Sequence, residues 1–203
     1  LCASPKKKGG LRPIAVGETL RRLTAKFLCQ EHKREAEKYL WPVQVGCGTR
    51  LGSEIAVHTA RQWCKRNAGD PNKVLIKIDF KNAVNCIDRS VFFREVQELL
   101  PGLSRWVQWC YTQSAHLFFG PYCLPSQTGV QQGDPLGPLL FSLALQPIAL
   151  QLARRGSQGN PGSPLDLCFF YLDDGLLAGD VVAVSSALSF LQTAASAVGL
   201  TLE

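Results

Sequence analysis

The sequence predicts a mixed α+β fold, on three observations. Short strand-like runs, such as the β-branched run at residues 74–79 and the aromatic run at 167–171, alternate with longer stretches whose apolar residues recur at helical spacing. Hydrophobic residues make up 46% of the 203 residues and charged residues 19%, which is too apolar for a disordered chain and enough to build a core. No solenoid, coiled-coil or collagen period is visible. We expect one globular domain, or two small subdomains.

The first third of the chain is expected to hold a hairpin and two helices. Residues 5–17 predict a hairpin with cationic side chains, because Gly9–Gly10 can form its turn. Residues 18–40 predict an amphipathic helix that ends before Pro42. Its apolar face is expected to comprise Leu20, Leu23, Phe27 and Leu28. After a glycine-rich loop at residues 44–52, Ser53 and Glu54 are suited to cap a helix that reaches residue 66.

The rest of the chain alternates strands and helices. Residues 74–79 predict a buried strand that ends at Asp79, and Asp88 is suited to cap the helix that follows. The remaining expected elements are a helix at 103–115, a hairpin at 117–122 and 126–130, an apolar helix to 155 kinked near Pro147, a hairpin at 167–171 and 176–179, and a helix at 182–198 that ends at Gly199. Residues 156–164 are expected to form a loop.

Charge is unevenly distributed along the chain. Residues 1–66 hold 14 Lys and Arg against 5 Asp and Glu, a net charge of +9. Residues 67–203 hold 8 against 11, a net charge of −3, and the whole chain carries +6. A basic lobe beside a mildly acidic remainder favours a surface for a polyanion next to a site that attracts cations. A solvated helix face is the alternative explanation of the run Lys6–Lys8.

The cysteines and the apolar stretches bear on the cellular setting. The eight cysteines show no C-x-x-C pair, so neither a zinc module nor a redox motif is indicated. We expect reduced, mostly buried thiols in an intracellular protein, in the nucleus or the cytoplasm. Residues 136–153 carry no charge, but two prolines and two glutamines interrupt them, so no membrane span is expected. The chain contains no Met, begins at Leu1 and ends at Glu203 where a new segment starts, so we expect it to be a piece of a longer protein.

Two adjacent carboxylates, Asp173 and Asp174, fall at the tip of the last expected hairpin. Such a pair is costly to crowd together unless a cation neutralises it. Hard oxygen ligands select Mg²⁺ or Mn²⁺, and Asp79 at another strand end can supply a third carboxylate for two ions. Asp-Asp-Gly is also an ordinary turn sequence, which stays open as the alternative.

Three segments in one order carry a family resemblance. They are Asp79-Phe-Lys-Asn-Ala-Val-Asn85, Gly129-Val-Gln-Gln-Gly-Asp-Pro-Leu-Gly-Pro-Leu-Leu-Phe141 and Phe170-Tyr-Leu-Asp-Asp174. They resemble motifs A, B and C of reverse transcriptases, most closely those of non-LTR retrotransposons and group II intron relatives. Gly10–Val16 and Gln44–Gly46 resemble two motifs of the fingers, and Gly199–Leu202 resembles the start of motif D.

The resemblance implies a right-hand polymerase fold, in which an antiparallel palm sheet packs on helices, with fingers present and the thumb missing. It divides the chain into fingers at 1–72, palm with motif A at 73–90, a fingers–palm connection at 91–130, and palm with motifs B, C and the start of D at 131–203. It further implies an RNA-directed DNA polymerase, a nucleotidyltransferase that extends a DNA primer on an RNA template with dNTPs. Nothing in the sequence indicates an oligomeric state.

The resemblance also assigns roles to individual residues. Asp79, Asp173 and Asp174 match the catalytic, metal-binding aspartates, and the backbone carbonyl of Phe80 matches a further ligand of the two Mg²⁺ or Mn²⁺ ions. Gln132 and Gly133 match residues that line the nucleotide pocket, where a glycine admits close approach of backbone. Substrate-binding residues on the fingers are Arg12 and one of Lys6 and Lys8, which match the basic residues that hold the triphosphate.

Two positions depart from the family pattern, and two other functions remain open. Val84 stands where most of these enzymes carry Phe or Tyr, which bears on sugar selectivity, and Gly137 stands where Ser is common. The chain stops before the lysine beyond motif D and before a thumb, so we expect a weak grip on a primer–template duplex and doubtful activity of this piece alone. The alternatives are an RNA-dependent RNA polymerase and a catalytically silent, retroelement-derived nucleic-acid-binding module.

Overall fold

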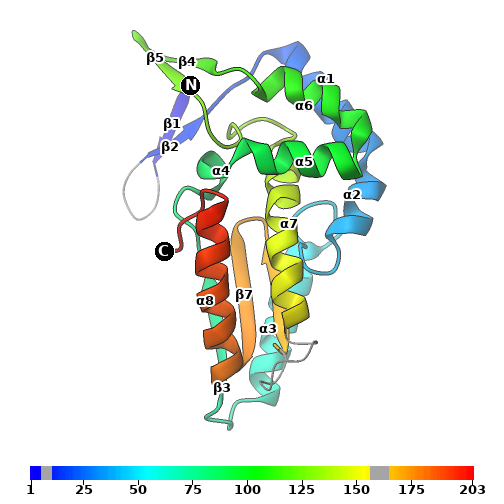
Figure 1. Cartoon of the computed structure of the whole chain (residues 1–203), viewed down its shortest axis with the longest axis vertical. Helices are drawn as coiled ribbons and strands as arrows, with labels where there is room; N and C mark the ends of the chain where they lie inside the picture. The colour runs from blue at the N-terminus through cyan, green and yellow to red at the C-terminus, as the bar shows by residue number, and fades with distance from the viewer. Residues whose placement is uncertain (6–10, 156–164) are drawn as a thin grey trace.

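The computed structural model describes residues 1–5, 11–155 and 165–203 (Figure 1). The strands are β1 (Cys2–Pro5), β2 (Leu11–Ile14), β3 (Lys73–Ile78), β4 (Ala115–Phe119), β5 (Tyr122–Ser126), β6 (Leu167–Tyr171) and β7 (Asp174–Asp180). The helices are α1 (Thr19–Glu31), α2 (Lys33–Leu40), α3 (Gly52–Arg66), α4 (Ala83–Cys86), α5 (Arg89–Leu99), α6 (Pro101–Tyr111), α7 (Gly137–Arg155) and α8 (Val181–Ala197). The predicted α+β class is confirmed.

A three-stranded antiparallel sheet in the order β3-β7-β6 lies at the centre of the lower half of the molecule. Helix α8 packs on β3 and β7, and α7 packs on β6. Figure 1 shows α7 and α8 side by side in front of this sheet. The register pairs Ile78 with Gly175 and Tyr171 with Asp174, so the end of β3 and the β6–β7 turn lie at one end of the sheet.

Helix α7 provides the centre of the hydrophobic core. Leu140, Phe141, Leu143, Leu145 and Leu152 are fully buried on it, so the helix is apolar around most of its circumference rather than along one stripe. Burial of each such side chain contributes about 1.5–3 kcal/mol relative to its exposure. The core that they form supports both the sheet and the helices α5 and α2, which also contact α7.

The two smaller hairpins, β1–β2 and β4–β5, lie together at the upper end of the molecule (Figure 1). An N-terminal hairpin forms as predicted, but its first strand lies before the expected range, with Cys2 paired to Ile14 and Pro5 to Leu11. Lys6, Lys8 and the expected turn at Gly9–Gly10 lie outside the described residues. The loop expected at residues 156–164 also lies outside them.

The helix expected over residues 18–40 is wrong in its continuity and in its buried face. It is divided at His32 into α1 and α2. Leu20, Leu23 and Phe27 are 63–68% exposed, whereas Ala25 is buried. Arg21 sets this rotation, because its guanidinium turns inward to Asp134, and the small Ala25 lets the helix approach its neighbours closely.

Three smaller expectations also need correction. The hairpin expected at 117–122 and 126–130 has its strands at Ala115–Phe119 and Tyr122–Ser126, because a tight turn at Gly120, whose φ is +56°, pairs Phe119 with Tyr122. Ser53 does not cap α3, since its hydroxyl donates to the Glu54 carboxylate instead. All eight cysteines are free, as expected, but only Cys110 is buried.

None of the helices in the described ranges combines the length and the apolar character that crossing a bilayer requires.

Candidate active site

The three candidate carboxylates lie at the same end of the central sheet. Asp79 follows the last residue of β3, Asp173 lies in the β6–β7 turn, and Asp174 opens β7. The antiparallel pairing of Ile78 with Gly175 brings Asp79 to the strand that begins at Asp174. A strand run that ends in an acid and a hairpin turn with two acids therefore converge, although about ninety residues separate them in the chain.

Negative charge at this end of the sheet is only partly compensated. Burial raises the pKa of the Asp173 carboxyl, and the charges of Asp174 and Asp79 raise it further, whereas Arg12 on β2 opposes them. The Lys77 ammonium lies 2.9 Å from a carboxylate oxygen of Asp174, and this contact raises the pKa of Lys77. The site thus has an excess of anionic oxygens over nearby cations.

The donor atoms suit a hard divalent cation, but the carboxylates are not gathered around one point. In the part of the chain that the structure describes, no group of three His, Cys, Asp or Glu side chains is arranged to hold a metal ion. The Asp174 carboxylate is instead paired with the Lys77 ammonium. Carboxylate oxygens under mutual repulsion are ligands that Mg²⁺ and Mn²⁺ prefer. The residues therefore fit divalent ions in chemistry, provided that Asp174 turns away from Lys77.

Phe80 lies directly beside these carboxylates and is itself buried. It forms an isolated antiparallel bridge with Leu202, in the segment that resembles the start of motif D. The hydrogen bonds of that bridge run from Lys81 N to Thr201 O, 2.8 Å, and from Glu203 N to Asp79 O, 3.0 Å. Neither of them uses the carbonyl of Phe80.

Motif B lies against the fingers hairpin through Gln132 and Gly133. The amide of Ala15, just after β2, donates to Gln132 O at 2.6 Å. Gly133 has a φ of +113°, and a Cβ on it would lie 2.5 Å from Ala15 O, so only glycine fits here. The predicted pocket residues and the hairpin that carries Arg12 are thus in direct contact.

The side chain of Gln132 connects motif B to motif A. Its Nε2 donates to Asn85 Oδ1 at 2.8 Å, and its Oε1 is buried with no hydrogen-bond partner among the residues that the structure describes. The carbonyl of Val84 accepts from the amide of Val130 at 2.7 Å, and the Val84 side chain packs, half-buried, against the core. An unpaired buried amide oxygen is costly unless a ligand supplies a donor to it.

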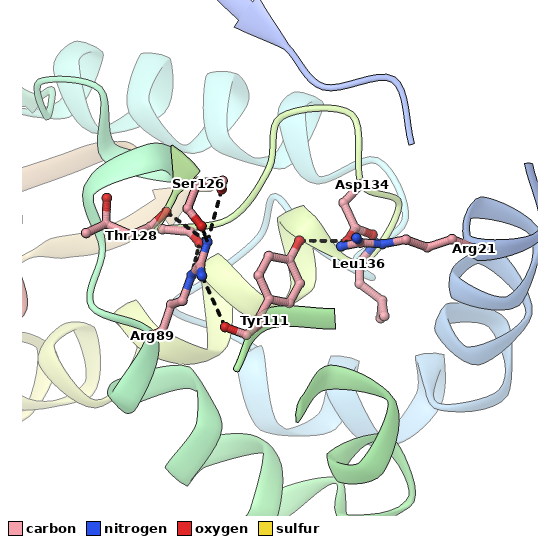
Figure 2. Close-up of polar contacts among 8 residues, drawn as sticks. Arg21, Arg89, Tyr111, Ser126, Thr128, Asp134 and Leu136 are labelled. Carbon is pink, nitrogen blue, oxygen red and sulfur yellow. Dashed lines mark hydrogen bonds and ion pairs between the residues drawn. The ribbon is translucent and has the colours of Figure 1, made fainter. Parts of the chain in front are cut away.

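A buried arginine holds the start of the motif B loop (Figure 2). Arg89, at the start of α5, is 9% exposed. Its guanidinium donates to carbonyls of Gly129, Tyr111, Ser126 and Thr128 and to the hydroxyl of Ser126, at 2.9–3.3 Å. One side chain therefore fixes the end of β5 and residues 128–129 relative to α5 and α6.

Asp134 holds the other end of the same loop. Its Oδ2 accepts from the Tyr111 hydroxyl at 2.6 Å and pairs with Arg21 at 3.4 Å, as Figure 2 shows. Its Oδ1 accepts from the amide of Leu136 at 2.9 Å, just before α7. The Tyr111 ring lies within 5.5 Å of the guanidinium carbons of both Arg21 and Arg89. Residues 129 and 134 are anchored, and Gln132 and Gly133 lie between these anchors.

The structure therefore brings together Asp79, Phe80, Asp173 and Asp174, with Arg12 close enough to affect the Asp173 carboxyl. The predicted ligands Lys6 and Lys8 lie outside the described residues. Sequence reasoning assigned no role to Lys77 or Asn85, although both stand within the motif A region. The alternation of side chains along a strand could have indicated Lys77, because residues two apart, such as Lys77 and Asp79, point to the same face of a sheet.

The central sheet with aspartates at one end, covered by helices on one side and joined to a basic hairpin, defines a polymerase palm with fingers. The sequence profile of the reverse transcriptase (RNA-dependent DNA polymerase) family matches residues 4–203. The chain therefore belongs to the reverse transcriptase family. Among curated proteins, no match is found.

Solved telomerase structures share the fold. The telomerase of Candida albicans, in complex with a TWJ fragment of telomeric RNA, superposes with a TM-score of 0.59 at 12% identity, over 91% of this chain and 33% of that chain. An apo telomerase of Candida tropicalis, truncated from its C-terminal domain, gives a TM-score of 0.60 at 14% identity, over 96% of this chain and 46% of that one. The chain thus spans a third to a half of these neighbours' length.

Proposed function

We propose that the chain is the polymerase domain of a retroelement reverse transcriptase, which extends a DNA primer on an RNA template with dNTPs. The observation that carries this proposal is the convergence of Asp79, Asp173 and Asp174 at one end of the palm sheet, facing the hairpin of Arg12, in a chain of this family. Nucleotidyl transfer needs concentrated negative charge that binds cations, with a triphosphate site beside it.

The three aspartates would hold two Mg²⁺ or Mn²⁺ ions, together with the carbonyl of Phe80. When bound, such ions supply Lewis acidity toward the primer 3′-hydroxyl and neutralise charge on the leaving pyrophosphate. The charge state of the chain's own groups supports this assignment, because the Asp173 carboxylate is insufficiently compensated by Arg12 and Lys77 alone. Lys77 keeps Asp174 paired until a stronger cation competes for it.

The incoming nucleotide would lie between the fingers hairpin and motif B. Arg12 would bind its triphosphate, as would one of Lys6 and Lys8. Gly133 lets the motif B backbone lie against Ala15 beside the hairpin of Arg12, and the Oε1 of Gln132, which bonds none of the described residues, is available to accept a hydrogen bond from substrate. Val84 would lie under the sugar, where a larger side chain would exclude a ribose 2′-hydroxyl.

The division into fingers at 1–72, palm at 73–90, connection at 91–130 and palm at 131–203 forms part of the proposal. The partners would be an RNA template, a DNA primer and dNTPs. Free thiols at all eight cysteines support an intracellular setting, in the nucleus or the cytoplasm.

The test is primer extension by the protein on RNA and DNA templates, with dNTPs or NTPs, at varied Mg²⁺ and Mn²⁺. Extension on RNA with dNTPs supports the proposal. Extension with NTPs alone would make the protein an RNA-dependent RNA polymerase. Binding of nucleic acid without extension under any of these conditions would identify a silent binding module.

Matched variants link any activity to the site. Asp79→Asn and Asp173→Asn should each abolish extension, with Asp174→Asn the mildest of the three changes. Asp88→Asn is the control, because Asp88 caps α5 through the amide of Ser90 and takes no part in the site. Undiminished synthesis by the Asp173→Asn protein, at the same Mg²⁺ dependence, would refute the metal assignment.

A further inference from the structure

The loop after α2 runs alongside the strand that leads into the aspartate turn. Gln44 forms an isolated parallel bridge with Phe170 of β6. Two backbone hydrogen bonds make this bridge, from Phe170 N to Val43 O at 2.7 Å and from Val45 N to Phe170 O at 2.8 Å. The Gln44 side chain is thereby carried to the level of residues 171–174, at 1% exposure.

The carboxamide of Gln44 binds both backbone groups of Leu172. Its Nε2 donates to Leu172 O at 3.1 Å, and its Oε1 accepts from Leu172 N at 2.8 Å. The same Oε1 accepts from Gly46 N at 3.0 Å, which fixes the orientation of the amide. A side chain from the fingers segment thus binds the residue immediately before Asp173.

Leu172 is the point of the turn that needs such support. Its φ is +58°, in the left-handed region, where the Cβ of a non-glycine residue lies too close to the following carbonyl oxygen. The turn has only Leu172 and Asp173 between the paired residues Tyr171 and Asp174. A change of backbone angle at Leu172 therefore redirects the Asp173 carboxylate.

Gly46 makes this contact sterically possible. A Cβ on Gly46 would lie 2.4 Å from Leu172 N and 2.8 Å from Tyr171 C, distances that no real side chain tolerates. The glycine lets the loop approach the turn closely enough for the Gln44 amide to reach both Leu172 groups. Gln44 and Gly46, two residues apart, act on the same backbone.

We infer that Gln44 is a positioning residue, which holds Leu172 in its left-handed conformation and so aims Asp173 at the metal site. This inference rests on the proposed function, because it assumes that Asp173 binds a divalent ion. It gives the fingers segment 44–46 a role in setting the geometry of the palm turn. The side chain itself touches neither substrate nor metal.

A purely structural role for a buried amide is the alternative, and the chain provides a matched control. Gln146 on α7 is fully buried, and its Nε2 donates to the carbonyls of Tyr39 and Leu40 at 2.9 and 3.1 Å. Gln146→Met and Gln44→Met each remove a buried carboxamide that bonds backbone. Gln146 shares Leu40 O with the amide of Gln44, but only the Gln44 side chain bonds the aspartate turn itself.

The first measurements need no catalysis. In the Gln44→Met protein, the amide hydrogen of Leu172 should exchange much faster, and Mn²⁺ binding followed by electron paramagnetic resonance should weaken about tenfold, the loss typical when an outer-shell partner is removed. Gln146→Met should leave both quantities unchanged within twofold. Equal effects of the two variants on Mn²⁺ binding, or no effect of either, would overturn the inference.

The second measurement is a rescue. Glycine adopts the left-handed region without steric cost, so adding Leu172→Gly to Gln44→Met should recover several-fold in Mn²⁺ affinity. In primer extension, Gln44→Met should lower kcat while leaving KM for dNTP nearly constant, since Arg12 and Gln132 are untouched. Absence of rescue would contradict the inference, whereas a wild-type protein that binds Mn²⁺ but never extends a primer would count against the proposed function alone.

Discussion

Asp173 is the carboxylate of the site whose surroundings most disfavour ionisation. Burial, followed by the charges of Asp174 and Asp79, raises its pKa above the ordinary value of 3.8. The folded state therefore binds the Asp173 proton more tightly than the unfolded state does. Ionisation of Asp173 then costs stability, and this cost grows as the pH rises through the folded pKa.

The Asp173→Asn change should therefore stabilise the protein at pH 7 in the presence of a chelator. Asparagine has nearly the same shape as aspartate but carries no charge, so it is not repelled by Asp174 and Asp79. The gain should shrink as the pH falls and should vanish below the unfolded value of 3.8, where the wild-type carboxyl is also neutral. Thermal unfolding midpoints over this pH range test it.

Asp166→Asn serves as the control of opposite sign. Burial opposes ionisation of Asp166, but hydrogen bonds from Lys73 and Trp63 outweigh it and lower its pKa. This variant should be less stable than wild type at pH 7. A destabilised Asp173→Asn protein at pH 7 would show that the carboxylates do not repel one another.

Arg12 is the cation of the fingers hairpin that acts on Asp173. If it binds the triphosphate, Arg12→Ala should raise KM for dNTP, since a contact to substrate is lost in both the ground state and the transition state. Steady-state kinetics with Arg105→Ala as control, an exposed arginine on α6, measures the difference. An unchanged KM and kcat would make Arg12 a surface charge only.

Val84 tests the selectivity of the sugar pocket. Its backbone carbonyl accepts from the amide of Val130 in motif B, and its half-buried side chain packs against the core. Val84→Phe should lower kcat/KM for NTPs more than for dNTPs by a steric clash of about 1–3 kcal/mol, roughly tenfold to a hundredfold.

The competing outcome for Val84 is overpacking of the palm, which would reduce both activities alike. Val91→Phe, at a buried position of α5, shows what overpacking alone does. A dNTP/NTP ratio of kcat/KM that is the same in wild type and Val84→Phe would mean that position 84 does not control the sugar.

At the level of elements, local sequence signals predicted the ends of helices correctly where a single residue type determines the backbone conformation. Asp88 caps α5 through the amide of Ser90 as expected, and Gly199 ends α8 with a φ of +80°. The face of α1 could not be predicted in the same way. Its rotation depends on the pairing of Arg21 with Asp134, which lies over a hundred residues further along the chain.

The network of Arg89, Tyr111 and Asp134 gives a test at this scale. Tyr111→Phe removes only the hydroxyl that donates to Asp134 at 2.6 Å. Loss of a hydrogen bond to a charged group should lower the free energy of unfolding by about 1.5–3 kcal/mol. Denaturant unfolding measures it, and the same variant should raise KM for dNTP, because Asp134 anchors the loop of Gln132.

Tyr39→Phe is the matched control for that change. The Tyr39 hydroxyl donates to the Glu95 carboxylate at 3.3 Å, away from motif B. The Tyr39→Phe change should also destabilise the protein, but by less than Tyr111→Phe, because the hydrogen bond that it removes is longer. It should leave KM for dNTP unchanged. Equal KM values for both variants would show that the network stabilises the fold without positioning the pocket.

For the whole molecule, the order of motifs predicted the convergence of Asp79 with Asp173 and Asp174, because family motifs carry tertiary information that periodicity does not. The contacts that adjust these residues lay beyond sequence reasoning. Lys77 reaches Asp174 across paired strands, and Gln44 reaches Leu172 across 128 residues. Such partners are specified by the folded path of the chain and not by any local pattern.

The division of charge gives the last prediction. Because the net charge is +9 over residues 1–66 and −3 over the remainder, most nucleic-acid affinity should reside in the N-terminal third. Replacing Lys6, Lys7 and Lys8 by Ala should then flatten the dependence of log Kd on log salt by up to about three phosphates' worth of released counterions.

Fluorescence anisotropy with a labelled RNA–DNA duplex, over a range of salt concentrations, measures this slope. The control variant replaces three exposed arginines by Ala: Arg94 on α5, Arg105 on α6 and Arg154 on α7. These substitutions remove as much positive charge, but from the acidic part of the chain. If the position of the charges determines nucleic-acid affinity, the triple lysine variant changes the slope of log Kd against log salt and the triple arginine variant does not. Equal changes in slope would mean that affinity follows total charge, and an unchanged slope in the lysine variant would mean that these three side chains are solvated and contact no phosphate.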